Sequence, residues 1–219
     1  MKSIALIHTV KTVANSFEQK LKDYVGEPVK IHNLWDDFLA NNPNEIGEFT
    51  IENRCRLYND IKSAEMTGAD MIVVTCSTLT PVVNMIRPFV RVPLIAIDDA
   101  MGQKAVTYGD RILVLATAGS TEGPMREKLN AEAAKLGKTI QIDFLANAEA
   151  FQAMKAVQME RHDAILLDMA KNISGYDCVV LAQASMAHLD QKIEAICKIP
   201  VLSSPGLCLE QVKETLKTI

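Results

Sequence analysis

Cys76 stands in the sequence VVTCSTLTP, directly after an apolar run of strand length. We expect a helix to begin at Ser77 or Thr78, with Pro81 in its first turn. Backbone N–H groups at a helix N-terminus, together with these two hydroxyls, can stabilise a thiolate or bind a carboxylate. The same pattern suits an inert cysteine packed in a core, so the local sequence leaves both interpretations open.

His8 is a second candidate, because it ends the apolar run SIALIH. The carboxyl ends of parallel strands meet at one edge of a sheet, so we expect His8 to emerge beside Cys76, where the two could share a proton. A structural histidine is an equal alternative. The remaining histidines, which lack a comparable position, are His32, His162 and His188. Of these, His188 could approach a ligand from the second half of the chain.

The second half carries a turn rich in hydrogen-bond donors, LATAGSTEGPM. Thr117 follows a strand-like run there, and Ser120 and Thr121 come just before a helical pattern. Such a strand-to-helix turn suits a carboxylate, and ordinary helix capping is the alternative.

The chain contains the same segment twice. Residues 68–97 and 175–204 overlay at a constant offset of 107, and SIALIHTV overlays RILVLATA at an offset of 108. Internal duplication predicts two similar α/β lobes related by an approximate twofold axis, with a ligand site in the cleft between them. In this overlay Cys76 falls opposite Gln183, which can hydrogen-bond a substrate but cannot exchange a proton at neutral pH.

The fold class follows from near-continuous apolar runs, which are typical of parallel strands covered on both faces. Helical patterns separate them, so we predict an α/β protein with two flavodoxin-like lobes, residues 1–98 plus 207–219 and residues 99–206. The polar stretch 40–50 is expected to be an irregular loop, either a lid over the ligand or a surface loop. The expected strands are 3–8, 29–34, 70–75, 92–97, 111–116, 178–182 and 199–203, and the expected helices are 53–67, 99–108, 123–136, 150–173 and 206–218.

Composition narrows the class of partner. The 219 residues carry a net charge of −4 without a cluster of Lys and Arg, which argues against nucleic acid or an anionic membrane and favours a small ligand. The opening apolar run is too short for a signal peptide, so a cytoplasmic protein is expected. Five cysteines without metal-ligand spacing predict free thiols and no metal site, the four apart from Cys76 being packing residues: Cys55, Cys178, Cys197 and Cys208.

These motifs resemble the aspartate/glutamate/hydantoin racemase superfamily over essentially the whole chain. TCST at 75–78 is similar to the first-lobe cysteine motif, and ATxxxT at 116–121 is similar to the second-lobe ligand-binding turn. The resemblance implies cofactor-independent chemistry in which two cysteines act on opposite faces of the carbon α to a carboxylate. Cys76 matches the first cysteine, while the family's Gly-Cys-Ala-Gly-Met-Ala sequence reads Ala-Gln-Ala-Ser-Met-Ala at 182–187.

The leading hypothesis is therefore a one-cysteine enzyme acting on a small carboxylate by isomerisation, decarboxylation or a lyase reaction. Cys76 and His8 are the expected catalytic residues. The alternatives are a racemase whose second base is His188 or Ser185, and a protein that binds a small acid without turning it over. The resemblance also implies a homo-oligomer. The expected substrate-binding residues are Thr9, Ser77, Thr78, Thr117, Thr121, Gln183, Ala184 and Ser185.

Overall fold

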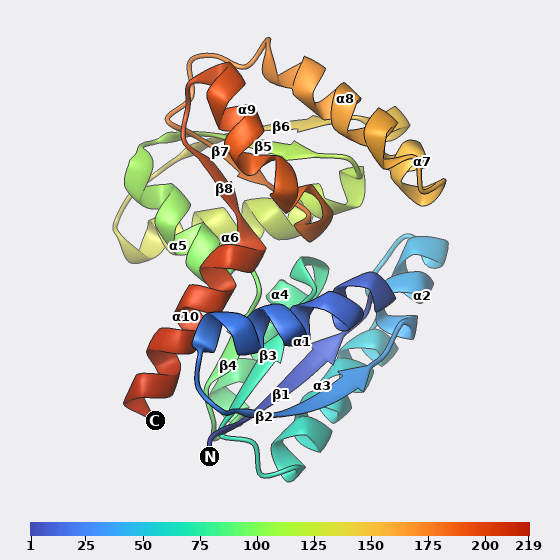
Figure 1. Cartoon of the computed structure of the whole chain (residues 1–219), viewed down its shortest axis with the longest axis vertical. Helices are drawn as coiled ribbons and strands as arrows, with labels where there is room; N and C mark the ends of the chain where they lie inside the picture. The colour runs from blue at the N-terminus through green and yellow to red at the C-terminus, as the bar shows by residue number, and fades with distance from the viewer. The chain divides into compact units, whose positions relative to one another are not determined.

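The computed structural model describes residues 1–219 with the exception of Thr12. Contacts divide the chain into a first unit, Met1–Ile97 with Cys208–Ile219, and a second unit, Asp98–Leu207. Each unit contains one parallel four-stranded sheet with helices around it (Figure 1). This confirms the α/β class with two lobes of the same design.

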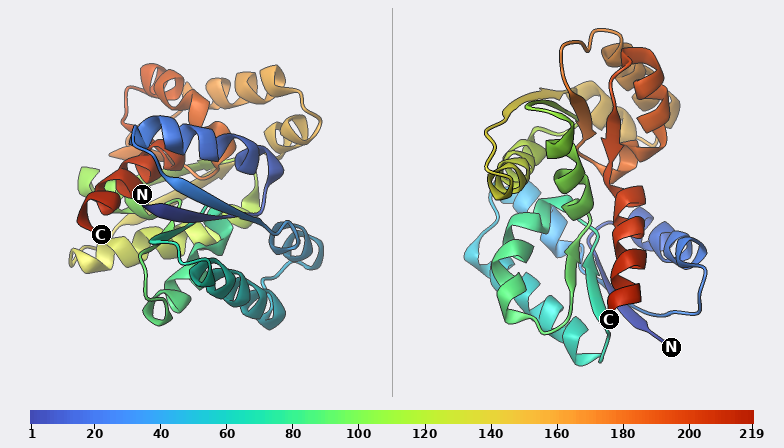
Figure 2. Two further views of the ribbon diagram at one scale, coloured as in Figure 1. Left: turned by 60° about the horizontal axis from the view of Figure 1, so that its bottom comes forward. Right: turned by 90° about the vertical axis from the view of Figure 1, so that its left-hand side faces the viewer.

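The first sheet has the strand order β2-β1-β3-β4. Helix α1 covers one face and α3 covers the other, as the blue and teal helices show (Figure 2, left). The strands are β1 (Ser3–His8), β2 (Lys30–Trp35), β3 (Met71–Val74) and β4 (Leu94–Ala96), and the helices are α1 (Lys11–Val25), α2 (Phe38–Ile46), α3 (Ile51–Met66) and α4 (Thr80–Ile86), with 3-10 turns η1 (Ser77–Leu79) and η2 (Arg87–Phe89).

The two faces of this sheet differ in chemistry. Ile7 and Val74 are register partners whose side chains share one apolar core with α3 and α4. Because side chains alternate along a strand, His8 and Thr75 point to the opposite face, beneath α1. The ring of His8 meets Phe17 of α1 edge-on, with 6.3 Å between the ring centroids.

The second sheet repeats this topology in the order β6-β5-β7-β8. Helices α5 and α6 lie on one side of it, and α8 and α9 lie on the other (Figure 1). The elements are β5 (Arg111–Ala116), β6 (Gln141–Ala146), β7 (Cys178–Leu181), β8 (Val201–Ser203), α5 (Asp99–Tyr108), α6 (Glu122–Lys135), α7 (Ala148–Lys155), α8 (Met159–Ala170), α9 (Asp190–Cys197) and α10 (Ser204–Thr218), with 3-10 turns η3 (Gly119–Thr121) and η4 (Ala184–Leu189).

The stretch 40–50, expected to be an irregular loop, is largely helical. Helix α2 runs to Ile46 with Pro43 inside it, and Gly47 ends it in the left-handed conformation, at φ 85°. Buried Leu39 anchors the helix, and the Asn44 side chain donates to the carbonyl of Ala40 at 2.8 Å. Tertiary anchoring of a short helix therefore outweighs the turn-forming composition.

The single helix expected over 150–173 is two helices, α7 and α8. Val157 adopts a positive φ of 58° between them. The N–H of Gln158 bonds back to the carbonyl of Ala153 at 2.9 Å, which closes the end of α7. The apolar spacing continues across this turn, so periodicity alone did not reveal the break. None of the helices in the described part of the chain is long and apolar enough to cross a membrane.

Candidate functional site

Cys76 lies just past the carboxyl end of β3. It is extended, at φ −125° and ψ 114°, and η1 begins at the next residue, Ser77, where the sequence placed the helix start. The thiol is partly exposed, and its Sγ lies 3.1 Å from Oγ1 of Thr78. The sulfur and this hydroxyl are thus within hydrogen-bonding distance, and either atom can be the donor.

The residue of β1 that stands level with Cys76 is Thr9. Ile7 pairs with Val74, so the same register carried two residues further brings Thr9 opposite Cys76, on the same face of the sheet. The Thr9 side chain is only 3% exposed, and its Oγ1 has no hydrogen-bond partner among the residues that the structure describes. A buried hydroxyl without a partner is costly, so this donor is suited to a bound ligand.

His8 is not paired with Cys76, contrary to the sequence-based expectation. Its Nδ1 lies 2.7 Å from Oγ1 of Thr75, and its Nε2 lies 3.1 Å from Oδ1 of Asn33. Strand alternation explains the difference, because it directs His8 and Thr75 to the face opposite Thr9 and Cys76.

The protonation state of His8 also bears on the expectation that it shares a proton with Cys76. Burial lowers the pKa of His8, and the Asn33 hydrogen bond and the Glu18 charge offset this only in part. The ring is therefore neutral at neutral pH and cannot form a thiolate–imidazolium pair.

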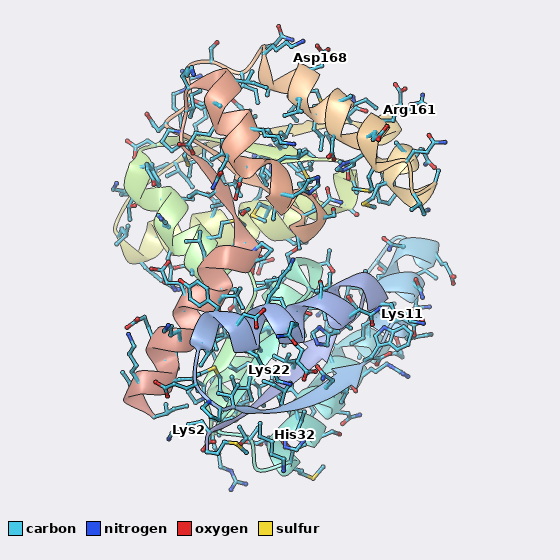
Figure 3. The ribbon with its side chains drawn as sticks, viewed as in Figure 1. Lys2, Lys11, Lys22, His32, Arg161 and Asp168 are labelled. Atoms are coloured by element: carbon cyan, nitrogen blue, oxygen red, sulfur yellow. The ribbon has the colours of Figure 1, made fainter. Side chains whose placement is uncertain are left out.

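A chain of polar side chains joins His8 to the surface, and the sequence did not reveal it. Asn33 on β2 donates its Nδ2 to Glu18 on α1 at 2.5 Å. Glu18 pairs with Lys22 one turn further along α1, and Lys22 is labelled in Figure 3. The strand KIHNLW also contains Lys30 and His32, so its polar composition gave no signal specific to Asn33. These hydrogen-bonded side chains fix the orientation of the His8 ring. Through that ring they also orient the side chain of Thr75, the residue before Cys76.

The equivalent turn of the second unit brings Thr117 and Gln183 together. Thr117, which is 1% exposed, donates its backbone N–H and its hydroxyl to Oε1 of Gln183 at 2.7 and 2.9 Å. Thr121 donates its hydroxyl to the carbonyl of Ala118 at 2.8 Å. The donors expected to hold a carboxylate here are thus engaged within the chain. Ala184 and Ser185 begin η4.

Two further histidines of the second unit meet on one carboxylate. Nδ1 of His162 and Nε2 of His188 each lie 2.8 Å from an oxygen of Asp163. Burial acts to raise the pKa of Asp163, but the hydrogen bonds from both histidines outweigh it and hold that pKa below its ordinary value. His188, considered as a second base, is therefore already in an ion-pair geometry with Asp163.

All five cysteines are free, as expected. Burial, followed by the charge of Asp177, raises the pKa of Cys178 to about 12, which makes that thiol inert. Cys208 is also buried, but Cys55 is exposed and is not the packing residue that the sequence indicated.

The Asp/Glu/Hydantoin racemase family model matches residues 7–212. The chain belongs to this family. An allantoin racemase from Klebsiella pneumoniae has a similar structure, with 16% identity and a TM-score of 0.68 over 100% of this chain and 89% of that one. A glutamate racemase from Bacillus anthracis is 14% identical, with a TM-score of 0.71 over 99% of this chain and 82% of that one. An uncharacterized protein of Schizosaccharomyces pombe is 23% identical over 90% of this chain and 85% of its own length.

Proposed function

We propose that this member of the Asp/Glu/hydantoin racemase family is a cofactor-independent enzyme acting at the carbon α to the carboxylate of a small acid. Cys76 is its one thiol acid/base. The observation that carries the proposal is the contrast between two equivalent pairs. Cys76 stands level with Thr9, whose buried hydroxyl has no partner among the described residues, whereas Gln183 and Thr117 are bonded to each other.

The proposed step begins with the Cys76 thiolate, which is stabilised by a hydrogen bond from Thr78. The sulfur takes the α-proton, and the electron pair of the broken C–H bond moves into the carboxylate to give an enediolate. Thr9 Oγ1 donates to the carboxylate oxygen on which the charge grows. The thiol then returns a proton to the same face of the α carbon, which restores the thiolate.

A malonate would follow a related course. The electron pair of the breaking C–C bond stays on the α carbon as carbon dioxide leaves, and the Cys76 thiol protonates that carbon. Water then supplies the proton that regenerates the thiol. In neither reaction does Gln183 transfer a proton, because an amide does not titrate near neutral pH.

The decisive experiment is incubation in deuterium oxide with aspartate, glutamate, hydantoins, maleate and methylmalonate. We expect deuterium exchange with retained configuration, isomerisation or carbon dioxide release for one of them. Cys76→Ser should lower that rate by about 10²–10⁴-fold. Cys55→Ser, which removes an exposed thiol, is the matched control and should leave the rate unchanged. Racemisation as fast as exchange would rule out the one-face mechanism.

A protein that binds a small acid without turnover is the second candidate, favoured by the absence of a titrating group at Gln183. Alkylation by iodoacetamide separates the two. An enzyme with an activated thiolate should react at Cys76 faster than at Cys55, although Cys55 is more exposed. Thr78→Val should slow the reaction at Cys76 only. Equal or slower alkylation of Cys76, together with no turnover of any acid, would favour the binding protein.

A further inference from the structure

Gln183 holds its side-chain carbonyl where the second unit has two convergent donors. One oxygen, Oε1, accepts both the backbone N–H and the hydroxyl of Thr117, at 2.7 and 2.9 Å. A carboxylate oxygen accepts the same pair of donors in the same way, only more strongly, because it is charged. The Gln183 amide thus has the shape and acceptor chemistry of a neutral carboxylate surrogate.

The first unit shows what this turn is like when the position after the strand holds a shorter side chain. There Cys76 stands where Gln183 stands in the second unit, by the same register: Ile7 pairs with Val74, and Leu115 pairs with Leu181. Thr9, the equivalent of Thr117, keeps its buried Oγ1 without a partner among the described residues. The long Gln183 side chain therefore accounts for the difference between the two turns: it occupies the donors of Thr117, whereas the shorter Cys76 leaves the Thr9 hydroxyl without a partner among the described residues.

We propose that Gln183 fills a carboxylate-binding subsite of the second unit with its own side chain, so that the two Thr117 donors are closed to a free carboxylate. The proposal rests on the proposed function only in taking the substrate to be a carboxylate. A tethered amide competes with free acid at a high effective concentration and loses no translational freedom on binding. An external carboxylate must displace it before it reaches Thr117.

The test uses the backbone amide of Thr117 as a reporter, with malonate as the carboxylate probe. In the full chain, the nuclear magnetic resonance signal of this N–H should not move on titration with malonate. In Gln183→Ala it should shift and saturate, and malonate should bind between about tenfold and a hundredfold more tightly than in the wild type. Gln183→Glu keeps an acceptor of the same length, so it should stay unresponsive. Adding Thr117→Val to Gln183→Ala should remove the gain.

Two results would overturn the proposal: a Thr117 signal that responds to malonate equally in the wild type and in Gln183→Ala, or no response in either. Gln183→Ser provides a second shortened side chain if the alanine variant does not fold. Repeating the titration with Cys76→Ser added separates this inference from the proposed function. That variant cannot perform the thiol chemistry, yet the malonate response of Thr117 should persist in it.

Discussion

The turn after β3 and the turn after β7 share one register but hold side chains of opposite character. In the first unit, a thiol stands level with a threonine whose buried hydroxyl lacks a described partner. In the second unit, the amide of Gln183 stands level with Thr117. Its oxygen accepts hydrogen bonds from both the backbone N–H and the hydroxyl of that threonine. The fold positions the two pairs alike, so the difference in chemistry comes from the change between Cys76 and Gln183. One unit thus leaves its threonine hydroxyl without a partner among the described residues, while the other bonds its threonine to a glutamine side chain of the same unit.

The opposite faces of the same strands differ as well. His8 and Thr75 contact each other in the first unit, while the overlaid residues Ala116 and Ala182 belong to an apolar core. The second sheet forms without any polar pair at this position. The hydrogen-bonded series of polar side chains around His8 is therefore not required by the sheet topology. It occurs in the unit that carries Cys76.

Replacing His8 should have the largest effect on this contrast. His8→Ala removes a fully buried ring that packs on Phe17, together with its hydrogen bonds to Thr75 and Asn33. We expect the free energy of unfolding to fall by about 2–4 kcal/mol, measured by urea denaturation.

The double variant His8→Ala with Thr75→Ala gives the first unit the alanine pair of the second. Because the two side chains share one hydrogen bond, the double variant should cost less than the sum of the single variants, by about 1 kcal/mol. Strict additivity would show that the His8–Thr75 contact carries no coupling, and the contrast between the two faces would lose its energetic basis.

The next effect concerns the two threonines. Thr117→Val removes a donated hydrogen bond and should lower the free energy of unfolding by about 1 kcal/mol. Thr9→Val removes a buried hydroxyl that has no partner among the described residues, so it should be neutral or stabilise the protein by up to about 1 kcal/mol. Thr9→Val should nevertheless lose activity, since this hydroxyl is proposed to bind the substrate. Destabilisation of equal size in both variants would show that the two turns are not different.

Much of the architecture could be predicted from the sequence. Apolar runs are local features, and the gap-free overlay of 68–97 on 175–204 placed equivalent strands and turns in two units of one topology. The helix at 38–46 could not be found in this way. Its stability depends on the burial of Leu39, a tertiary contact, while its Asn-rich and Pro-containing sequence is typical of turns.

The candidate site was predicted less completely. The overlay indicated Cys76, Thr117 and Gln183 as residues of the two turns, because they follow recognisable strands. Which residue stands beside Cys76 depends on the register between β1 and β3, and these two strands lie far apart in the sequence. Without that register His8 was preferred over Thr9. The bond between Thr117 and Gln183 depends on the corresponding register of the second sheet.

The smallest effect is the pH dependence of stability. Burial lowers the pKa of His8 in the folded state, so the unfolded chain binds the extra proton first, and His8 should reduce stability as the pH falls below about 6.5. Asp60 acts in the opposite direction. Burial, together with a hydrogen bond and charge from Asp36, raises the pKa of Asp60 to about 7, so its contribution grows as the pH falls through that value.

Asp60→Asn removes this opposing contribution and isolates His8. In that variant the free energy of unfolding should decrease as the pH is lowered from about 7 to about 5. The slope should be smaller than about 1.4 kcal/mol per pH unit, the largest value that the binding of one proton can give. Adding His8→Gln should flatten the slope, because glutamine does not titrate. The second unit has Ala116 at the equivalent position and can contribute no such slope there. An unchanged slope after His8→Gln would mean that the His8 ring titrates alike in the folded and unfolded chains, and would remove the pH dependence from the contrast between the two units.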